Sequence, residues 1–153
     1  MAEFPIASDV DVFGACRGAR EHAAVVGFLR LECEQIAIVV SELATNILKY
    51  GIRGAISIQE VDDPTRGRGL RITATDCGPP FHDLQMALQD GYDDRGKIEP
   101  GAMFKRRGLG CGLGAVVRFT HTIEYEPLDK GKRLRVVRYL RPGLGVAGRP
   151  RRT

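Results

Sequence analysis

The strongest constraint on the fold is a stripe of apolar residues between about Leu31 and Tyr50. The spacings within the stripe are one, three or four residues, which is the period of an α-helix with one buried face. Gly51 is placed to end this helix. We therefore predict a core helix over 31–50. Its apolar positions are Ile36, Val39, Val40, Leu43, Ile47 and Leu48.

Strand-like and helix-like segments alternate along the rest of the chain. Before the core helix, 4–6 is predicted to be a short strand, and a helix capped by Ser8 or Asp9 ends at Gly27. After it, 55–61 and 70–75 alternate as half-buried strands do, with the polar stretch 62–69 as a hairpin loop. The remaining predicted segments are a short helix at 83–90, a long loop at 91–107, a helix through 116–119 and a hairpin formed by 121–126 and 132–140.

The length and composition indicate one globular domain. The chain has 153 residues, of which 43% are hydrophobic and 27% charged. We assign this domain to 1–140, and predict that the Gly-, Pro- and Arg-rich tail at 141–153 is disordered. The net charge of +4 comes from four arginines in that tail, so 1–140 carries 19 basic and 19 acidic residues. A neutral body argues against nucleic acid as a partner.

The sequence also indicates the compartment. The longest mostly apolar stretch, Ile36–Val40, is far shorter than the ~20 residues of a membrane-spanning helix. The acidic N-terminus does not resemble a secretory leader. There is no C-x-x-C pair among the four cysteines, which are Cys16, Cys33, Cys77 and Cys111. We therefore expect reduced thiols and no zinc site. We therefore expect a cytoplasmic protein that does not associate with membranes.

A glycine-rich segment points to an anion site. Gly108, Gly110, Gly112 and Gly114 alternate directly after three basic residues and directly before a helix. Such a segment can gather backbone N–H groups around a polyphosphate, although it can also be a flexible connector. It matches the dinucleotide-binding G-x-G-x-x-G pattern poorly, because a charged loop precedes it instead of a strand.

Two residues of the core helix and one strand end carry the groups that phosphoryl transfer needs. Glu42 and Asn46 are four residues apart and therefore project from one helix face. A carboxylate can accept the proton of an attacking hydroxyl, and an amide oxygen can bind Mg²⁺. Such a pair also occurs on solvated helix faces. Asp76 adds a carboxylate at a turn, where it can accept a hydrogen bond from an exocyclic amine such as that of adenine.

These motifs, in this order, resemble the nucleotide-binding boxes of the GHKL (Bergerat-fold) ATPases. They are Glu42-x-x-x-Asn46, Asp76-x-Gly78 and the glycine series 108–114. The stretches SELATNILKYG, DCGPPFHDLQMALQDGY and GLGCGLGAVVRF are most similar to the RsbT-type switch kinases of bacterial stress signalling. The resemblance covers about 4–140. It implies a two-layer α/β sandwich, in which a mixed or antiparallel sheet carries the helices on one face.

The resemblance also implies roles for individual residues. Glu42 would be the general base, Asn46 the Mg²⁺ ligand and Asp76 the acceptor of the adenine amine. Gly78 would shape the turn after Asp76, 91–107 would form a lid over ATP, and the four glycines would bind its phosphates. Our own further candidates for phosphate contacts are Lys49, Lys105, Arg106 and Arg107, although these cations can also be solvated or, for Lys49, snorkelling.

The sequence departs from the family pattern at two positions. Pro80 stands in place of the second glycine of D-x-G-x-G, which is common in the related RsbW/SpoIIAB anti-sigma kinases. The last box, often Gly-x-Gly-Thr, reads Lys130-Gly131-Lys132-Arg133, so the threonine contact is missing. The second departure predicts an altered affinity on the adenine side.

Three functions are compatible with the resemblance. The first is an ATP- and Mg²⁺-dependent serine/threonine kinase of a partner-switching pathway, which phosphorylates a STAS-domain antagonist and activates a PPM-type phosphatase. The second is an anti-sigma factor kinase of the RsbW/SpoIIAB type, whose partner is a sigma factor. The third is a nucleotide-dependent binding module without phosphotransfer, against which the presence of both Glu42 and Asn46 argues.

Overall fold

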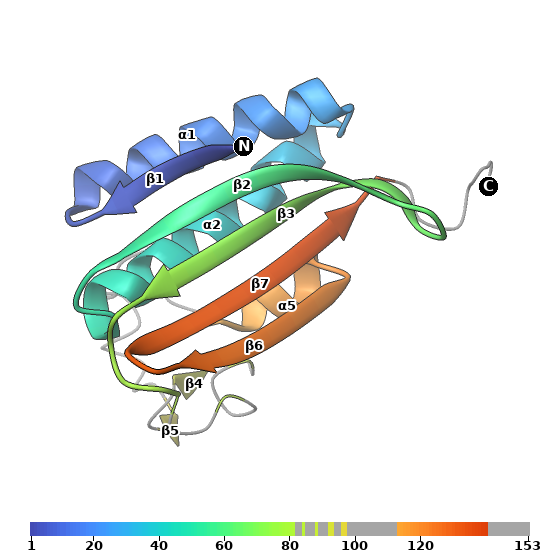
Figure 1. The fold of residues 1–153 in the computed structure, drawn as a ribbon. Coiled ribbons are helices and arrows are strands. Elements are labelled where there is room, and N and C mark those ends of the chain that lie inside the picture. The colour runs from blue at the N-terminus through green and yellow to red at the C-terminus, as the bar shows by residue number, and fades with distance from the viewer. Residues whose placement is uncertain (82–83, 85–87, 89–91, 94–95, 98–112, 141–153) are drawn as a thin grey trace.

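The fold is a two-layer α/β sandwich (Figure 1). The computed structural model describes residues 1–81, 84, 88, 92–93, 96–97 and 113–140. The described helices are α1 (Asp9–Val26), α2 (Arg30–Tyr50) and α5 (Gly114–Phe119). The described strands are β1 (Ala2–Ile6), β2 (Gly54–Asp63), β3 (Gly67–Asp76), β4 (Tyr92–Asp93), β5 (Gly96–Lys97), β6 (Thr122–Leu128) and β7 (Gly131–Tyr139).

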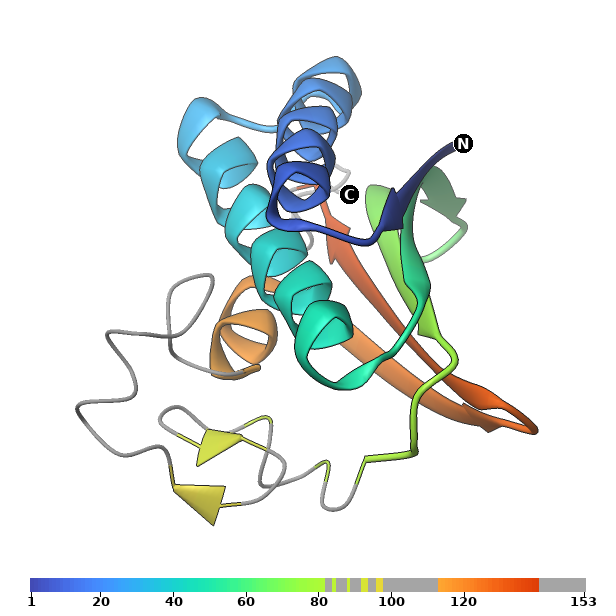
Figure 2. The same cartoon turned by 90° about the vertical axis from the view of Figure 1, so that its left-hand side faces the viewer.

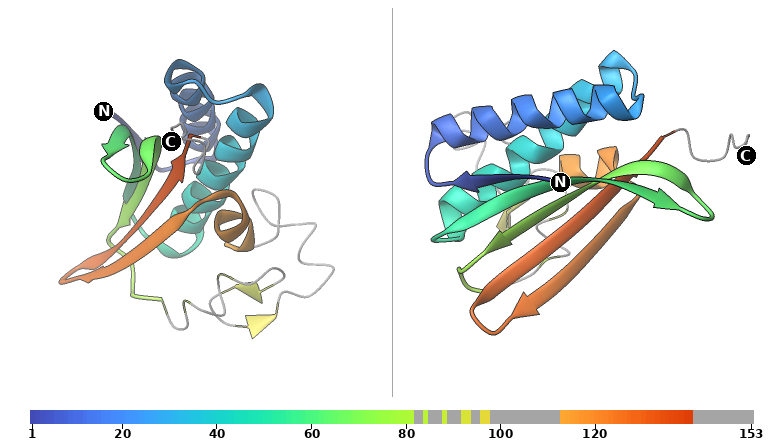
Figure 3. Two further views of the ribbon diagram at one scale, coloured as in Figure 1. Left: turned by 90° about the vertical axis from the view of Figure 1, so that its right-hand side faces the viewer. Right: turned by 45° about the horizontal axis from the view of Figure 1, so that its top comes forward.

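Five of these strands form the main sheet, in the order β1-β2-β3-β7-β6. Every neighbouring pair in it is antiparallel. Figures 2 and 3 show α1, α2 and α5 together on one face of this sheet. The predicted α/β sandwich is confirmed, and of the two sheet types expected the antiparallel one is found in the described part of the chain.

The hydrophobic core lies between α2 and the sheet. The apolar stripe of α2 packs there, with Ile36, Val39 and Val40 at 0% exposure and Leu48 partly buried. The sheet contributes alternate residues such as Ile56, Ile58 and Ile72, because successive side chains of a strand point to opposite faces. The helical period of α2 and the alternation of the strands thus meet in one apolar layer.

Local capping sets where the two long helices begin. The Asp11 carboxylate accepts hydrogen bonds from the backbone N–H groups of Ala7 and Ser8 just before α1. The Glu32 carboxylate likewise accepts from the N–H of Leu29 before α2. Acidic groups here satisfy N–H donors that the helix leaves unpaired. Gly27 ends α1 with a left-handed φ of 117°.

The loop predicted at 62–69 is wrong in extent. Strands β2 and β3 continue through most of it and pair as far as Asp63 and Gly67. The Asp63 carboxylate accepts hydrogen bonds from the N–H groups of Arg66 and Thr65, which tightens the turn and lowers the pKa of Asp63. Polar residues at strand ends read as a loop in the sequence, yet their backbones still pair.

Other predictions fall partly outside the described residues. Within 91–107, predicted to be a loop, the two short strands β4 and β5 pair with each other in antiparallel fashion. In the predicted helix at 83–90, Leu88 N–H donates to Leu84 O, and most of that segment lies outside the described residues. The tail at 141–153 lies outside them as well.

Two further findings concern apolar and thiol groups. No helix in the described part of the chain is long and apolar enough to cross a membrane. Cys16 and Cys33 are buried as expected of packing residues, whereas Cys77 is exposed. Burial raises the pKa of the Cys16 thiol, so this side chain stays protonated at neutral pH.

Candidate functional site

Helix α2 carries Glu42 and Asn46 on consecutive turns. Glu42 is 2% exposed, although its side chain is ionisable, and Asn46 is half-buried. Both lie in the C-terminal half of α2, and the residue that follows this helix lies against the end of β3. The spacing of four residues therefore produces the expected result, in which two polar groups lie on one side of a core helix.

The second part of the site is a buried ion pair between neighbouring strands. Asp76 ends β3 and is paired in register with Lys132 of β7. The Lys132 ammonium lies 3.1 Å from Asp76 Oδ1, and the two side chains are 4% and 5% exposed. Asp76 Oδ1 also accepts a hydrogen bond of 2.8 Å from the N–H of Gly78. Two partners on one oxygen hold this carboxylate in a fixed orientation.

Lys132 makes two further contacts besides Asp76. Its ammonium donates to the carbonyl oxygen of Pro79 at 2.9 Å. It also lies 5.2 Å from the ring centre of Phe81, within the range of a cation–π contact. Phe81 in turn packs edge-to-face on Tyr125 of β6. Sequence reasoning noted Lys132 as a departure from the family box and did not predict it as a site residue, and it did not single out Phe81 at all.

Glycines allow the turn after Asp76 to pack against both neighbouring segments. A Cβ at Gly78 would lie 2.2 Å from the carbonyl oxygen of Tyr50, at the end of α2. A Cβ at Gly131 would lie 1.8 Å from the carbonyl oxygen of Asp76, and Gly131 has a φ of 129°. Neither position has room for a side chain. The backbone around Asp76 is consequently fixed from the α2 side and from the β6–β7 turn.

One small cavity brings predicted residues from distant segments together. It has a volume of about 10 Å³, room for a single water molecule. Asn46 of α2 and Asp76 of β3 both line it, so the structure places the predicted Mg²⁺ ligand and the predicted adenine acceptor at one site. The lining residues are Leu43, Asn46, Ile47, Ala74, Asp76, Phe81, Lys132 and Leu134.

The other predicted site residues do not line this cavity or lie outside the described residues. Glu42 and Lys49 do not line this cavity, and Lys49 is half-buried in the last turn of α2. Gly114 is the buried first residue of α5, which packs against α2. The predicted phosphate-contacting residues Lys105, Arg106, Arg107, Gly108, Gly110 and Gly112 lie outside the described residues.

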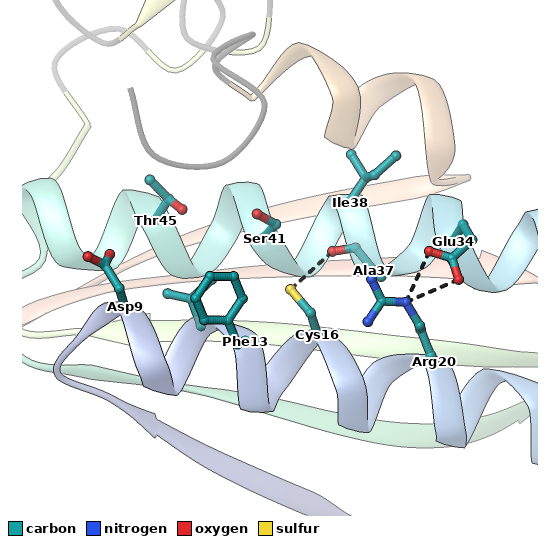
Figure 4. Close-up of a pocket in the computed structure, with 10 residues that line it drawn as sticks. Asp9, Phe13, Cys16, Arg20, Glu34, Ala37, Ile38, Ser41 and Thr45 are labelled. Atoms are coloured by element: carbon teal, nitrogen blue, oxygen red, sulfur yellow. Dashed lines mark hydrogen bonds and ion pairs between the residues drawn. The ribbon is translucent and has the colours of Figure 1, made fainter. Parts of the chain in front are cut away.

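A larger cavity of about 680 Å³ lies between α1 and α2 (Figure 4). An ion pair of 3.0 Å between Arg20 and Glu34 joins the helices at one end of it, and Cys16 Sγ donates to the carbonyl oxygen of Ala37. Thr45 Oγ1 is buried there without a hydrogen-bond partner in the described part of the chain. None of its described lining residues is a predicted site residue or lines the Asp76 cavity.

The residues around Asp76 suit an adenine nucleotide with Mg²⁺. A fixed carboxylate can accept from an exocyclic amine, and the Asn46 amide oxygen is a hard ligand of the kind Mg²⁺ binds. Among the described residues, no group of three His, Cys, Asp or Glu side chains is arranged to hold a metal. Mg²⁺ at this site would therefore depend on phosphate oxygens in addition to Asn46, as it does in many kinases.

Comparison with known proteins shows the family to which the chain belongs. Residues 7–138 match the histidine kinase-like ATPase domain family, and the chain belongs to that family. Membership implies the use of ATP. Over 138 residues the chain is also 31% identical to serine/threonine-protein kinase RsbT of Bacillus subtilis (strain 168), a match that covers 89% of this chain and 94% of RsbT. The two matches confirm the predicted class, a serine/threonine kinase of the GHKL type.

Proposed function

We propose that the chain is an ATP- and Mg²⁺-dependent protein serine/threonine kinase of a partner-switching pathway, with a STAS-domain antagonist as its substrate. The observation that carries the proposal is the meeting of Asn46 and Asp76 at one cavity. Glu42 lies one turn away on the same helix. The near full-length similarity to RsbT supports the choice of pathway.

Each residue has a distinct task in this mechanism. Bound ATP supplies the γ-phosphoryl group. Asp76 fixes the nucleobase by accepting a hydrogen bond from its exocyclic amine, and Asn46 holds Mg²⁺ through its amide oxygen. Glu42 orients the substrate hydroxyl and takes up its proton. Glu42 is 2% exposed, so its carboxylate is shielded from bulk water.

The proposal extends to the state of the kinase after it has phosphorylated its antagonist. Released from that antagonist, the kinase would bind and activate a PPM-type phosphatase. The neutral charge balance of 1–140 agrees with protein partners and not with nucleic acid.

The test is phosphotransfer from labelled ATP to the STAS protein encoded nearest to this chain, in the presence of Mg²⁺. Glu42→Gln should lower the transfer rate by roughly 10²–10⁴-fold while ATP binding is retained. The matched control is Glu34→Gln, which removes a carboxylate from the exposed face of the same helix and should leave the rate unchanged.

Two results would contradict the proposal. Equal rates in wild type and Glu42→Gln would remove Glu42 from the mechanism. Capture of a sigma factor by the purified chain, without any activation of a PPM-type phosphatase, would assign it to the anti-sigma kinases instead.

A further inference from the structure

The last family box reads Lys130-Gly131-Lys132-Arg133 in this chain, without a threonine, and its second lysine is buried. Lys132 is 3% exposed and lies on the same strand face as Leu134 and Val136. Its ammonium is next to the carboxylate that the proposed function assigns to the nucleobase, 3.1 Å from Asp76 Oδ1. A charged hydrogen-bond donor therefore stands beside the Asp76 carboxylate, in a box that lacks the neutral hydroxyl of the family pattern.

The two oxygens of Asp76 are used unequally. Both hydrogen bonds that this carboxylate accepts from described residues go to Oδ1, from Gly78 N–H and from Lys132. Oδ2 is then the oxygen available to a ligand. An ammonium has three N–H donors, and two of those on Lys132 are directed to Asp76 and Pro79. The third has no hydrogen-bond acceptor among the described residues and can donate to a ligand.

An acceptor and a charged donor side by side suit more than one purine. Adenine offers an amine donor at position 6 and an acceptor at N1. Guanine and hypoxanthine offer an acceptor, O6, next to a donor, N1–H. A carboxylate with only a neutral hydroxyl beside it repels O6, whereas an ammonium donates to O6 and the carboxylate accepts from N1–H. Charge-assisted hydrogen bonds of this kind are about twice as strong as neutral ones.

We propose that Lys132 is a specificity-determining residue through which the site accepts 6-oxopurine nucleotides, such as GTP, in addition to ATP. The proposal rests on the proposed function, because it uses Asp76 as the nucleobase acceptor. It goes beyond that function by assigning Lys132 the contact to O6. Phe81, whose ring already lies against the ammonium, supplies an aromatic face at the same place.

The small size of the cavity indicates that the side chains around it change their hydrogen-bond partners when a nucleobase binds. Its volume of about 10 Å³ holds a water molecule and not a purine, so the nucleobase must displace side chains that line it. The Lys132 stem has several rotatable bonds and can swing while its ammonium stays near Asp76. Ligand O6 then takes a hydrogen bond from Lys132 without leaving the carboxylate unpaired.

The test measures nucleotide binding by calorimetry, with no need for activity. Wild type should bind ATP and GTP with affinities within about tenfold of each other. Lys132→Thr, which replaces the ammonium beside Asp76 by a neutral hydroxyl, should retain ATP and weaken GTP by about tenfold or more relative to ATP. ITP has O6 but no 2-amino group, so a parallel loss of ITP would place the contact at O6. Lys130→Thr, at the exposed neighbouring lysine of the same turn, is the matched control and should change neither affinity.

Each failure has a separate meaning. Wild type that binds ATP but not GTP would overturn the role of Lys132 and leave the proposed kinase intact. Equal losses of ATP and GTP in Lys132→Thr would show a structural role for Lys132 and would likewise overturn it. Wild type that binds neither nucleotide would refute the proposed function itself. Thermal unfolding of both variants without nucleotide separates loss of fold from loss of binding.

Discussion

Replacing Asp76 with asparagine is expected to destabilise the fold by about 3 kcal/mol. The change leaves the Lys132 ammonium buried without a countercharge, and breaking one side of a buried ion pair costs about 3–5 kcal/mol. We expect the lower end of that range, because the carbonyl oxygen of Pro79 and the new amide oxygen still accept hydrogen bonds from the ammonium. Lys132→Met should cost a similar amount, since it leaves the carboxylate with Gly78 N–H as its described partner.

The double variant separates the pair from its surroundings. Asp76→Asn with Lys132→Met removes both charges, so its loss of stability should be about 3 kcal/mol or less and not the sum of the single losses, about 6 kcal/mol. Urea unfolding of the four proteins measures this coupling. With a urea dependence of about 1–3 kcal/mol/M, each single variant should unfold at a midpoint lower by about 1 M or more.

A surface pair of similar length is the control. Arg20 and Glu34 lie 3.0 Å apart, but their side chains are 45% and 52% exposed. Solvent screening limits the coupling of such a pair to about 1 kcal/mol or less. A coupling between Asp76 and Lys132 no larger than that of the control pair would refute the argument that burial makes this contact strong.

Two further predictions concern stability. Desolvation lowers the pKa of His121 below its usual 6.5, and its Nδ1 accepts the N–H of Tyr139 at 3.0 Å. Below about pH 6.5 the unfolded chain takes up a proton that the folded state resists, so thermal stability should fall between pH 7.5 and 5.5, and His121→Gln should reduce that fall. An equal fall in both proteins would contradict this assignment. Backbone strain at a left-handed φ alone costs about 1–3 kcal/mol. Gly131→Ala should lower the free energy of unfolding by more than this, because the added Cβ also clashes with the Asp76 backbone. Gly67→Ala, which has a left-handed φ and no atom within 4 Å of the added Cβ, should cost about 1–2 kcal/mol, and equal losses in urea unfolding would show that the clash relaxes.

The sequence predicted the elements well because their signals are local. The stripe of α2 and the alternation in β2 and β3 each lie within a few residues, and the glycines at 27 and 51 mark the helix ends. The error at 62–69 has a local cause too, since polar residues at strand ends look like a loop. What continues the strands there is backbone pairing between Asp63 and Gly67, which composition does not record.

A residue of the candidate site was predictable only where the signal for it lies within its own helix or strand. Glu42 and Asn46 follow from helical spacing, and Asp76 from its place at a strand end. Lys132 is 56 residues from Asp76 in the chain, and their contact depends on the pairing of β3 with β7. A register between distant strands has no signature in the spacing of either one. The altered last family box was the signal that could have directed attention to Lys132.

The register of β3 and β7 also explains why Lys132 is buried. Leu134 and Val136 follow it at intervals of two residues and pack into the core, so the same alternation turns Lys132 inward beside Asp76. A slip by one residue would move all three side chains to the polar face, where Arg133 and Arg135 now pair with Glu126 and Glu124. Both faces of β7 therefore oppose such a slip. Since the apolar residues and the outer ion pairs fix the register without Lys132, a substitution at 132 should change the contents of the site and leave the strand pairing in place.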